Sequence, residues 1–205
     1  DIDPKMQDAE RVLRRDLAAC FRLCALFGWD DHIATHMSAR LPDGTFLLNP
    51  FGSLFEEVTA SSLVRVSMDG TVISPPGHPM NAAAFTIHSA VLGGRPDAQC
   101  VIHLHTRDGA AVSAIEDGLL PLTQTALNIY HDIAYHDYEG TANDLDERER
   151  LQADLGDRNV LILRNHGTLA TGASVGAAFY RIYNLEFACA AQVRALGMGR
   201  PVRLP

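Results

Sequence analysis

Residues 101–106 read Val-Ile-His-Leu-His-Thr, and this stretch organises the interpretation of the whole chain. Residues 99–104 are mostly apolar and predict a buried strand. Side chains two positions apart on a strand point to the same face, so His103 and His105 are expected side by side. Two imidazoles in that arrangement can share a metal ion without distorting the backbone. Taken alone, the pair is equally well explained as an ordinary strand pair on the surface or in the core.

A third histidine follows a second apolar strand, which is predicted over residues 160–163. His166 lies in Leu-Arg-Asn-His-Gly, directly after that strand. A ligand from a neighbouring strand end would complete a three-histidine site with His103 and His105. Such a site leaves coordination positions open for water or substrate, as a catalytic metal requires. We therefore expect one divalent ion per chain, zinc first, with manganese or iron as alternatives.

The flanking segments predict helices and short antiparallel strands. Residues 8–27 predict a helix whose apolar stripe consists of Leu13, Leu17, Cys20, Cys24 and Phe27. Short strands are expected over residues 33–41, 45–49, 63–66 and 71–74, joined by turns such as Pro-Asp-Gly. Further helices are expected over residues 81–92, 108–115 and 144–155, and after a cap at Ser174. Together they predict one layered α/β domain over residues 1–205, with a central, largely antiparallel sheet.

The composition is that of an ordinary globular protein. The chain has 205 residues, 47% hydrophobic and 20% charged, which suffices for one domain with a buried core. A formal net charge of −8 makes nucleic acid and anionic membranes poor partners. No apolar run reaches bilayer length, and the stretch DIDPKMQDAE lacks signal-peptide features. Four cysteines without a Cys-x-x-Cys pair predict reduced, buried thiols and a cytoplasmic location.

From residue 8 to residue 196 the chain resembles the class II aldolase/adducin family. The resemblance rests on stretches that occur in the family's order: Gly-Trp-Asp-Asp with Thr-His-Met-Ser-Ala-Arg, Leu-Asn-Pro-Phe-Gly-Ser-Leu-Phe, Phe-Thr-Ile-His-Ser-Ala, Arg-Pro-Asp-Ala, Val-Ile-His-Leu-His-Thr, Ala-Tyr-His-Asp-Tyr-Glu-Gly and Val-Leu-Ile-Leu-Arg-Asn-His-Gly. The stretches around His105, Tyr138 and His166 are most similar to the adducin head domain and its bacterial relatives.

The resemblance implies a three-layer α/β/α fold and a homotetramer with active sites at subunit interfaces. It also implies one metal ion held by His103, His105 and His166. In the sugar-phosphate aldolases of the family, the metal polarises a substrate carbonyl or enediolate. A glutamate on the preceding helix acts as the base, and a tyrosine from the neighbouring subunit assists.

This chain departs from that pattern around the expected substrate. The glutamate position falls on Ala84, and the tyrosine position falls near Gln124 or Thr125. The hydroxyl residues that bind phosphate in the aldolases fall on Phe51, Ala82 and Ala83. Alanine cannot transfer a proton, so the ordinary sugar-phosphate reaction is not expected.

The intact histidine set favours a metal-dependent carbon–carbon lyase of the aldolase or decarboxylase type. Its expected substrate is a small, non-phosphorylated oxo- or hydroxy-carboxylic acid. The candidate catalytic residues are His36, which matches a phosphate-contacting asparagine of the aldolases, Tyr138 and His131, with Glu57 as a further substrate contact. Core packing is the alternative role for Tyr138. Two other functions remain open: a non-haem metal oxygenase and a non-catalytic, adducin-like assembly domain.

The remaining histidines have more modest expected roles. His32 and His136 lie in polar or turn-like stretches, where a surface position is the default. His78 is expected in a loop. His88 lies on the helix before the strand of His103, where packing or a hydrogen bond that supports the site is expected.

Overall fold

The computed structural model describes residues 8–142, 144–202 and 204, and eight strands of this part form one mixed sheet. Their order is β4-β3-β2-β1-β5-β8-β7-β6. The strands are β1 (His36–Arg40), β2 (Phe46–Leu48), β3 (Val64–Val66), β4 (Val72–Ser74), β5 (Cys100–Leu104), β6 (Ile133–His136), β7 (Val160–Leu163) and β8 (Gly167–Gly172). Every neighbouring pair is antiparallel except β6 and β7. The expectation of a mixed, largely antiparallel sheet is therefore confirmed.

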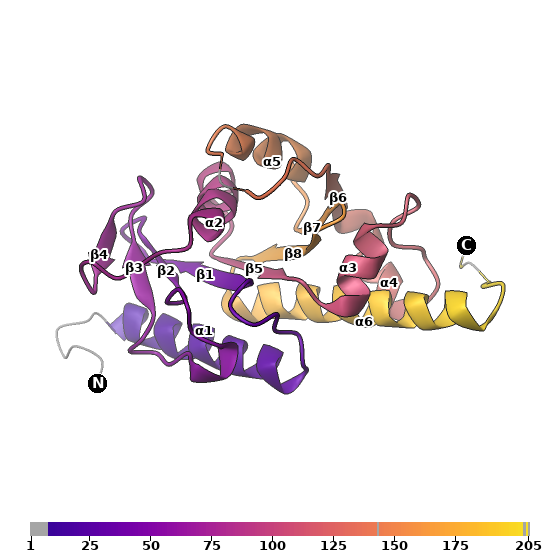
Figure 1. Cartoon of the computed structure of the whole chain (residues 1–205), viewed down its shortest axis with the longest axis horizontal. Coiled ribbons are helices and arrows are strands. Elements are labelled where there is room, and N and C mark those ends of the chain that lie inside the picture. Colours follow the sequence, from indigo (N-terminus) through magenta and orange to yellow (C-terminus); the bar gives the residue numbers. More distant parts are fainter. Residues whose placement is uncertain (1–7, 143, 203, 205) are drawn as a thin grey trace.

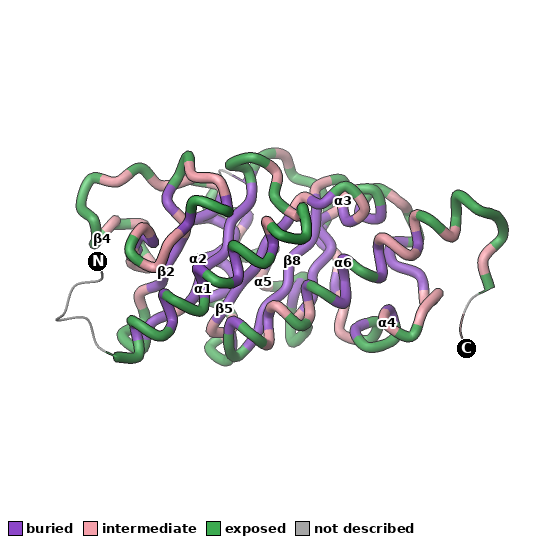
Figure 2. The backbone as a smooth tube through the Cα atoms, turned by 90° about the horizontal axis from the view of Figure 1, so that it is seen from below, coloured by how far each residue is buried: buried purple, intermediate pink, exposed green. Residues whose placement is uncertain are grey.

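Helices cover both faces of this sheet, which makes three layers (Figure 1). One face carries α2 (Ala82–Gly94) and α5 (Glu147–Leu155). The other carries α1 (Asp8–Leu26), α3 (Arg107–Ser113), α4 (Gln124–Leu127) and α6 (Val175–Met198). A separate apolar cluster fills each of the two spaces between layers. The central strands are buried, the edge strand β4 is largely exposed, and the helices alternate between buried and exposed residues (Figure 2). The three-layer α/β/α fold is thus confirmed.

Helix α1 follows the predicted apolar stripe over most of its length, and its residues from Leu13 to Cys24 on that stripe are buried. Phe27 differs, because it lies one residue beyond the end of α1, is 47% exposed and stacks on Trp29. That part of the prediction is wrong: once the helix ends, the chain no longer returns to the same face. All four cysteines are buried and free, as expected. Within the described ranges, no helix is long and apolar enough to cross a membrane.

Strand β8 occupies the middle of the sheet although its sequence carries little strand signal. It reads Gly-Thr-Leu-Ala-Thr-Gly, which is neither a continuous apolar run nor a clean alternation, and every residue in it is buried. Glycine at both ends permits close neighbours. A Cβ on Gly167 would lie 2.4 Å from the carbonyl oxygen of Leu104, and one on Gly172 would lie 2.4 Å from the amide nitrogen of Ala178.

His136, expected at the surface, is buried at the end of β6 beneath α5. Its Nδ1 lies 2.7 Å from Oδ2 of Asp154, and its Nε2 lies 3.4 Å from Oε1 of Glu147. The surface expectation is wrong because α5 supplies carboxylate partners that make burial of the ring acceptable. His32 is exposed and His78 lies half-buried in a loop, as expected for each.

Candidate metal centre

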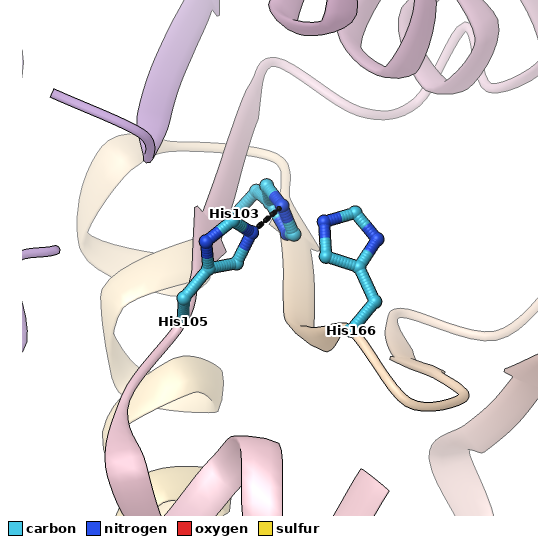
Figure 3. Close-up of side chains that lie close together, drawn as sticks. All are labelled: His103, His105 and His166. Carbon is cyan, nitrogen blue, oxygen red and sulfur yellow. Dashed lines mark hydrogen bonds between the residues drawn. The ribbon is translucent and has the colours of Figure 1, made fainter. Parts of the chain in front are cut away.

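The three histidines converge at one end of the central strands, where β5 ends (Figure 3). His103 lies on β5, His105 follows that strand, and His166 lies in the turn between β7 and β8. One ring nitrogen from each can be chosen such that all three lie within 4.8 Å of one another. Small changes in side-chain torsions would place each of these nitrogens about 2.0–2.1 Å from a shared ion, which is the distance between zinc and a histidine nitrogen. The sequence expectation that these residues meet in space agrees with this geometry.

The turn before β8 explains how a residue so distant in sequence reaches β5. Leu163 pairs with Gly167 across the turn, and β8 pairs with β5 from Leu104 to Cys100. Asn165 adopts a left-handed backbone with φ of 56°, which asparagine tolerates better than most residues. The absence of a side chain at Gly167 lets this turn lie against the Leu104 carbonyl group. His166 is therefore held opposite His103 and His105.

The Nδ1 atoms of His103 and His105 each have a partner that sets the orientation of the ring. Nδ1 of His103 donates to the carbonyl oxygen of Thr168 at 2.9 Å. Nδ1 of His105 lies 3.2 Å from Oδ2 of Asp31. These contacts turn the two Nε2 atoms toward each other, 2.9 Å apart. Two imidazole nitrogens that face each other need a proton or a cation between them, so the donor set fits a metal ion.

Burial keeps these imidazoles neutral, the form that binds metal. Burial, and then the neighbouring rings of His36, His105 and His166, hold the pKa of His103 well below its usual value. Burial lowers the pKa of His105, while the hydrogen bond to Asp31 opposes that effect. Burial also lowers the pKa of His166 to about 4. At neutral pH each ring therefore keeps one N–H group, and its other nitrogen carries the lone pair that can bind a metal ion.

A cavity of about 580 Å³ borders the three histidines and also receives His36 and Tyr138. Tyr138 is 58% exposed at its rim, so core packing is not its role. The third candidate, His131, lies elsewhere: it is exposed in the short 3-10 helix Tyr130–Asp132, against the ring of Tyr130. Glu57 also lies outside the lining, where it accepts a hydrogen bond from the backbone of Leu54.

A buried polar chain stands behind His36. Nδ1 of His36 lies 2.8 Å from Nε2 of His88, and Nδ1 of His88 lies 2.5 Å from Oγ of Ser38. Burial lowers the pKa of His88 to about 3 and holds the pKa of His36 well below its usual value. His88, expected to pack or to form a hydrogen bond that supports the site, has His36 and Ser38 as its partners rather than one of the three candidate ligands. Because His88 engages Nδ1 of His36, a ligand in the cavity would meet Nε2.

The start of α2 forms the opposite wall. Asn81 caps the helix through the amide nitrogens of Ala83 and Ala84, and Asn81 and Ala83 line the cavity. Ala84, which matches the glutamate position, is 1% exposed, packs in the second apolar cluster and is not a lining residue. Phe51 is also outside the lining. Among the described residues of the lining there is no lysine or arginine.

Sequence reasoning assigned no role to several residues that the fold brings to the site. Asp31 belongs to the quoted Gly-Trp-Asp-Asp stretch, but nothing in its spacing connects it to His105. Asn81 and Asn165 line the cavity, and their only sequence signals are those of a helix cap and a turn. Glu186 carries no signal at all, because a single glutamate on a helix is normally exposed.

Comparison with known proteins supports the same assignment. The family model "Class II Aldolase and Adducin N-terminal domain" matches residues 15–193. Mouse alpha-adducin is 49% identical over 192 residues, which are 91% of this chain and 26% of alpha-adducin. An aldolase II superfamily protein from Pseudomonas syringae has a TM-score of 0.95 at 50% identity, over 100% of this chain and 84% of that one. L-fuculose 1-phosphate aldolase from Glaciozyma antarctica PI12 has a TM-score of 0.87 at 30% identity, over 99% of this chain and 82% of that one. The three-layer fold, the histidine group and these matches agree, and this chain belongs to the class II aldolase/adducin family.

Proposed function

We propose that this chain is a metal-dependent carbon–carbon lyase, of the aldolase or decarboxylase type, that acts on a small, non-phosphorylated oxo- or hydroxy-carboxylic acid. The observation that carries the proposal is the three-histidine group beside a cavity of about 580 Å³. We propose that His103, His105 and His166 bind one divalent ion, with zinc first and manganese or iron as alternatives. Residues 1–205 would form a single domain around this site.

The chemistry divides between the ion and the side chains around it. When bound, the ion would supply Lewis-acid stabilisation of the negative charge that develops as a carbon–carbon bond breaks. His36 would orient the substrate through its Nε2, which faces the side of the ring away from His88. Tyr138, at the rim, would exchange a proton with the substrate through its hydroxyl group. His131 lies outside this cavity, so we assign it no role within one chain.

The lining supports a substrate without phosphate. Neutral polar groups come from Asn81, Thr141 and Asn165, while Ala83 and Ile87 are apolar. A phosphate group here would lack the charge-assisted hydrogen bonds that normally hold it, each worth about 1.5–3 kcal/mol. A carboxylate bound at the ion would not need them, because the metal charge balances it.

We also propose a homo-oligomer in the cytoplasm, with a tetramer as the first expectation and active sites at subunit interfaces. Aromatic rings gather beyond the end of α1 and along α6: Phe27, Tyr183 and Phe187 are 47%, 37% and 50% exposed. Their ring centroids lie 5.8 Å apart for Phe27 and Tyr183, and 6.3 Å apart for Tyr183 and Phe187. Contiguous exposed apolar surface of this kind is typical of protein contacts. The buried free thiols are compatible with a reducing compartment.

The decisive experiment is an activity screen of defined metal forms. The chain would be stripped with a chelator, reloaded with zinc, manganese or iron(II), and assayed against 2-oxo and 2-hydroxy acids, both aliphatic and aromatic. We expect turnover of at least one acid that requires metal and is lost in His166→Ala. Turnover that survives complete metal removal would contradict the proposal.

An assembly domain is the second candidate, because alpha-adducin is 49% identical over the matched residues. The same screen separates the two functions. A chain that binds metal and oligomerises but turns over no acid in any metal form would favour assembly over catalysis.

A further inference from the structure

A buried glutamate lies on α6, behind the candidate metal centre. Glu186 is 2% exposed, on a helix whose buried residues are mostly apolar. Its Oε1 accepts a hydrogen bond of 2.5 Å from the hydroxyl group of Thr168. Its Oε2 accepts one from the hydroxyl group of Thr106. Each carboxylate oxygen therefore has its own donor, and the two donors come from different segments.

Both threonines adjoin candidate metal ligands. Thr106 directly follows His105, and its hydroxyl oxygen also accepts from the amide of Gly109 to cap α3. Thr168 lies two residues after His166, and its carbonyl oxygen accepts from Nδ1 of His103. One carboxylate thus ties together the end of β5 and the start of β8.

Gly109 brings α3 close to this carboxylate. A Cβ on Gly109 would lie 2.7 Å from Oγ1 of Thr106 and 3.0 Å from Oε2 of Glu186. Glycine at this position lets α3 approach α6 closely enough to enclose the bonds. Since the enclosed threonines have little freedom, their backbone positions, and hence those of the adjacent histidines, depend on the carboxylate.

We propose that Glu186 is a positioning residue that holds the ends of β5 and β8 in the geometry in which His103, His105 and His166 bind one ion. This inference rests on the proposed metal site but not on any particular substrate. Glu186 acts through Thr106 and Thr168 and touches neither the ion nor the substrate.

The burial of this group argues against a purely structural role. Within the described part of the chain no cation pairs with Glu186, and a buried carboxylate without such a pair is an unfavourable core residue. Burial raises the pKa of Glu186 to about 7 even though both hydroxyl groups lower it, so the hydrogen bonds do not fully offset the loss of water. A residue that stabilises the fold poorly yet organises two ligand-bearing segments is best explained by the site.

The test measures zinc affinity of the metal-stripped full chain by competition with a chromophoric chelator. Glu186→Gln keeps the shape of the side chain but replaces one acceptor oxygen by an NH2 donor. One of the two threonine hydroxyl groups therefore loses its acceptor. We expect zinc affinity to fall about tenfold, the lower end for groups that support metal ligands. Glu10→Gln is the matched control, because Glu10 is also buried but bonds Arg14 and Arg65, far from the histidines in the fold. Its zinc affinity should equal that of wild type.

A second pair of variants keeps the test valid if Glu186→Gln folds poorly. Thr168→Val removes the hydroxyl donor, whereas Thr168→Ser retains it. We expect zinc affinity to fall in the valine variant and to be close to wild type in the serine variant. In the double variant with Glu186→Gln, the loss should be smaller than the product of the two single losses, because both substitutions act on the same group of hydrogen bonds around residue 186.

The outcomes distinguish this inference from the proposed function. Wild-type zinc affinity in Glu186→Gln, equal losses in Thr168→Val and Thr168→Ser, or multiplicative losses in the double variant would overturn the positioning role alone. A wild-type chain that binds neither zinc, manganese nor iron would overturn the metal site and the positioning role together.

Discussion

Replacing Glu186 by glutamine should change the pH dependence of stability in the metal-free protein in a defined direction. In the unfolded chain the carboxyl group ionises near the usual value of 4.5, whereas burial raises the pKa in the folded chain to about 7. Between these values the unfolded state releases a proton that the folded state retains. The stability contribution of Glu186 is therefore fully present below pH 4.5 and is lost as the pH rises through 7. Glutamine has no such dependence.

The size of the effect follows from the two pKa values. Each pH unit between 4.5 and about 7 changes the free energy of unfolding by about 1.4 kcal/mol. Over this range the wild type should therefore lose roughly 3 kcal/mol of unfolding free energy relative to the variant. The protonated carboxyl group carries a hydrogen on one oxygen, as the amide carries hydrogens on its nitrogen, so at low pH the two side chains offer the threonines the same acceptor. We expect Glu186→Gln to be about as stable as wild type at pH 4.5 and more stable by roughly 3 kcal/mol at pH 8.

Urea unfolding in the presence of a chelator, at half-unit steps from pH 4.5 to 8, measures this difference. Titrations shared by the two proteins, including those of the buried histidines, cancel when the two free energies of unfolding are subtracted. A difference that stays constant over the whole range would refute the reasoning, because it would mean that Glu186 ionises alike in the folded and unfolded states.

Four further predictions concern the site and the assembly. His105→Ala should lose most of the bound metal, and a metal content equal to wild type would refute the ligand assignment. Wild type should not cleave L-fuculose 1-phosphate. Ala84→Glu alone should not create that activity, because Ala84 is buried outside the cavity lining. Efficient cleavage by wild type would mean that the chain is an ordinary sugar-phosphate aldolase. The stability of metal-free wild type relative to His88→Asn should fall as the pH drops below 6.5, because burial lowers the pKa of His88 to about 3 and only the unfolded ring takes up the proton; a pH-independent difference in urea unfolding would contradict this. Light scattering should give a mass above that of one chain at micromolar concentration, whereas a monomer mass would refute the oligomer.

Local periodicity was enough to determine several parts of this protein. The two-residue spacing of His103 and His105 on an apolar strand put both rings on one face, and the continuous run Val-Leu-Ile-Leu predicted the buried strand β7. The alternating spacing of four and three residues on α1 predicted which side of the helix meets the sheet. These features depend only on where neighbouring side chains point from a regular backbone, which the sequence itself specifies. The family resemblance supported His166 as the third candidate ligand and supplied the order of the layers.

Tertiary structure decided the features that depend on contacts between distant segments. His36 and His88 are 52 positions apart, and Thr106 and Glu186 are 80 apart. No periodic pattern links such pairs, because their meeting depends on the order of strands and on which helix covers which face. The burial of His136 likewise required α5 to fold over β6.

Strand β8 and the cavity wall formed by α2 show most clearly what the sequence determines and what only the tertiary structure decides. β8 has no strong strand pattern, and it becomes central because glycines at its ends admit the Leu104 carbonyl group on one side and α6 on the other. On α2, counting along the sequence identified Ala84 as the position of the missing base, but helix rotation places Ala83 in the cavity lining and Ala84 in the core. The sequence thus determined the chemical groups and their local faces. Only packing decided which of those groups share one cavity, since burial and hydrogen bonding are settled by the complete set of neighbours.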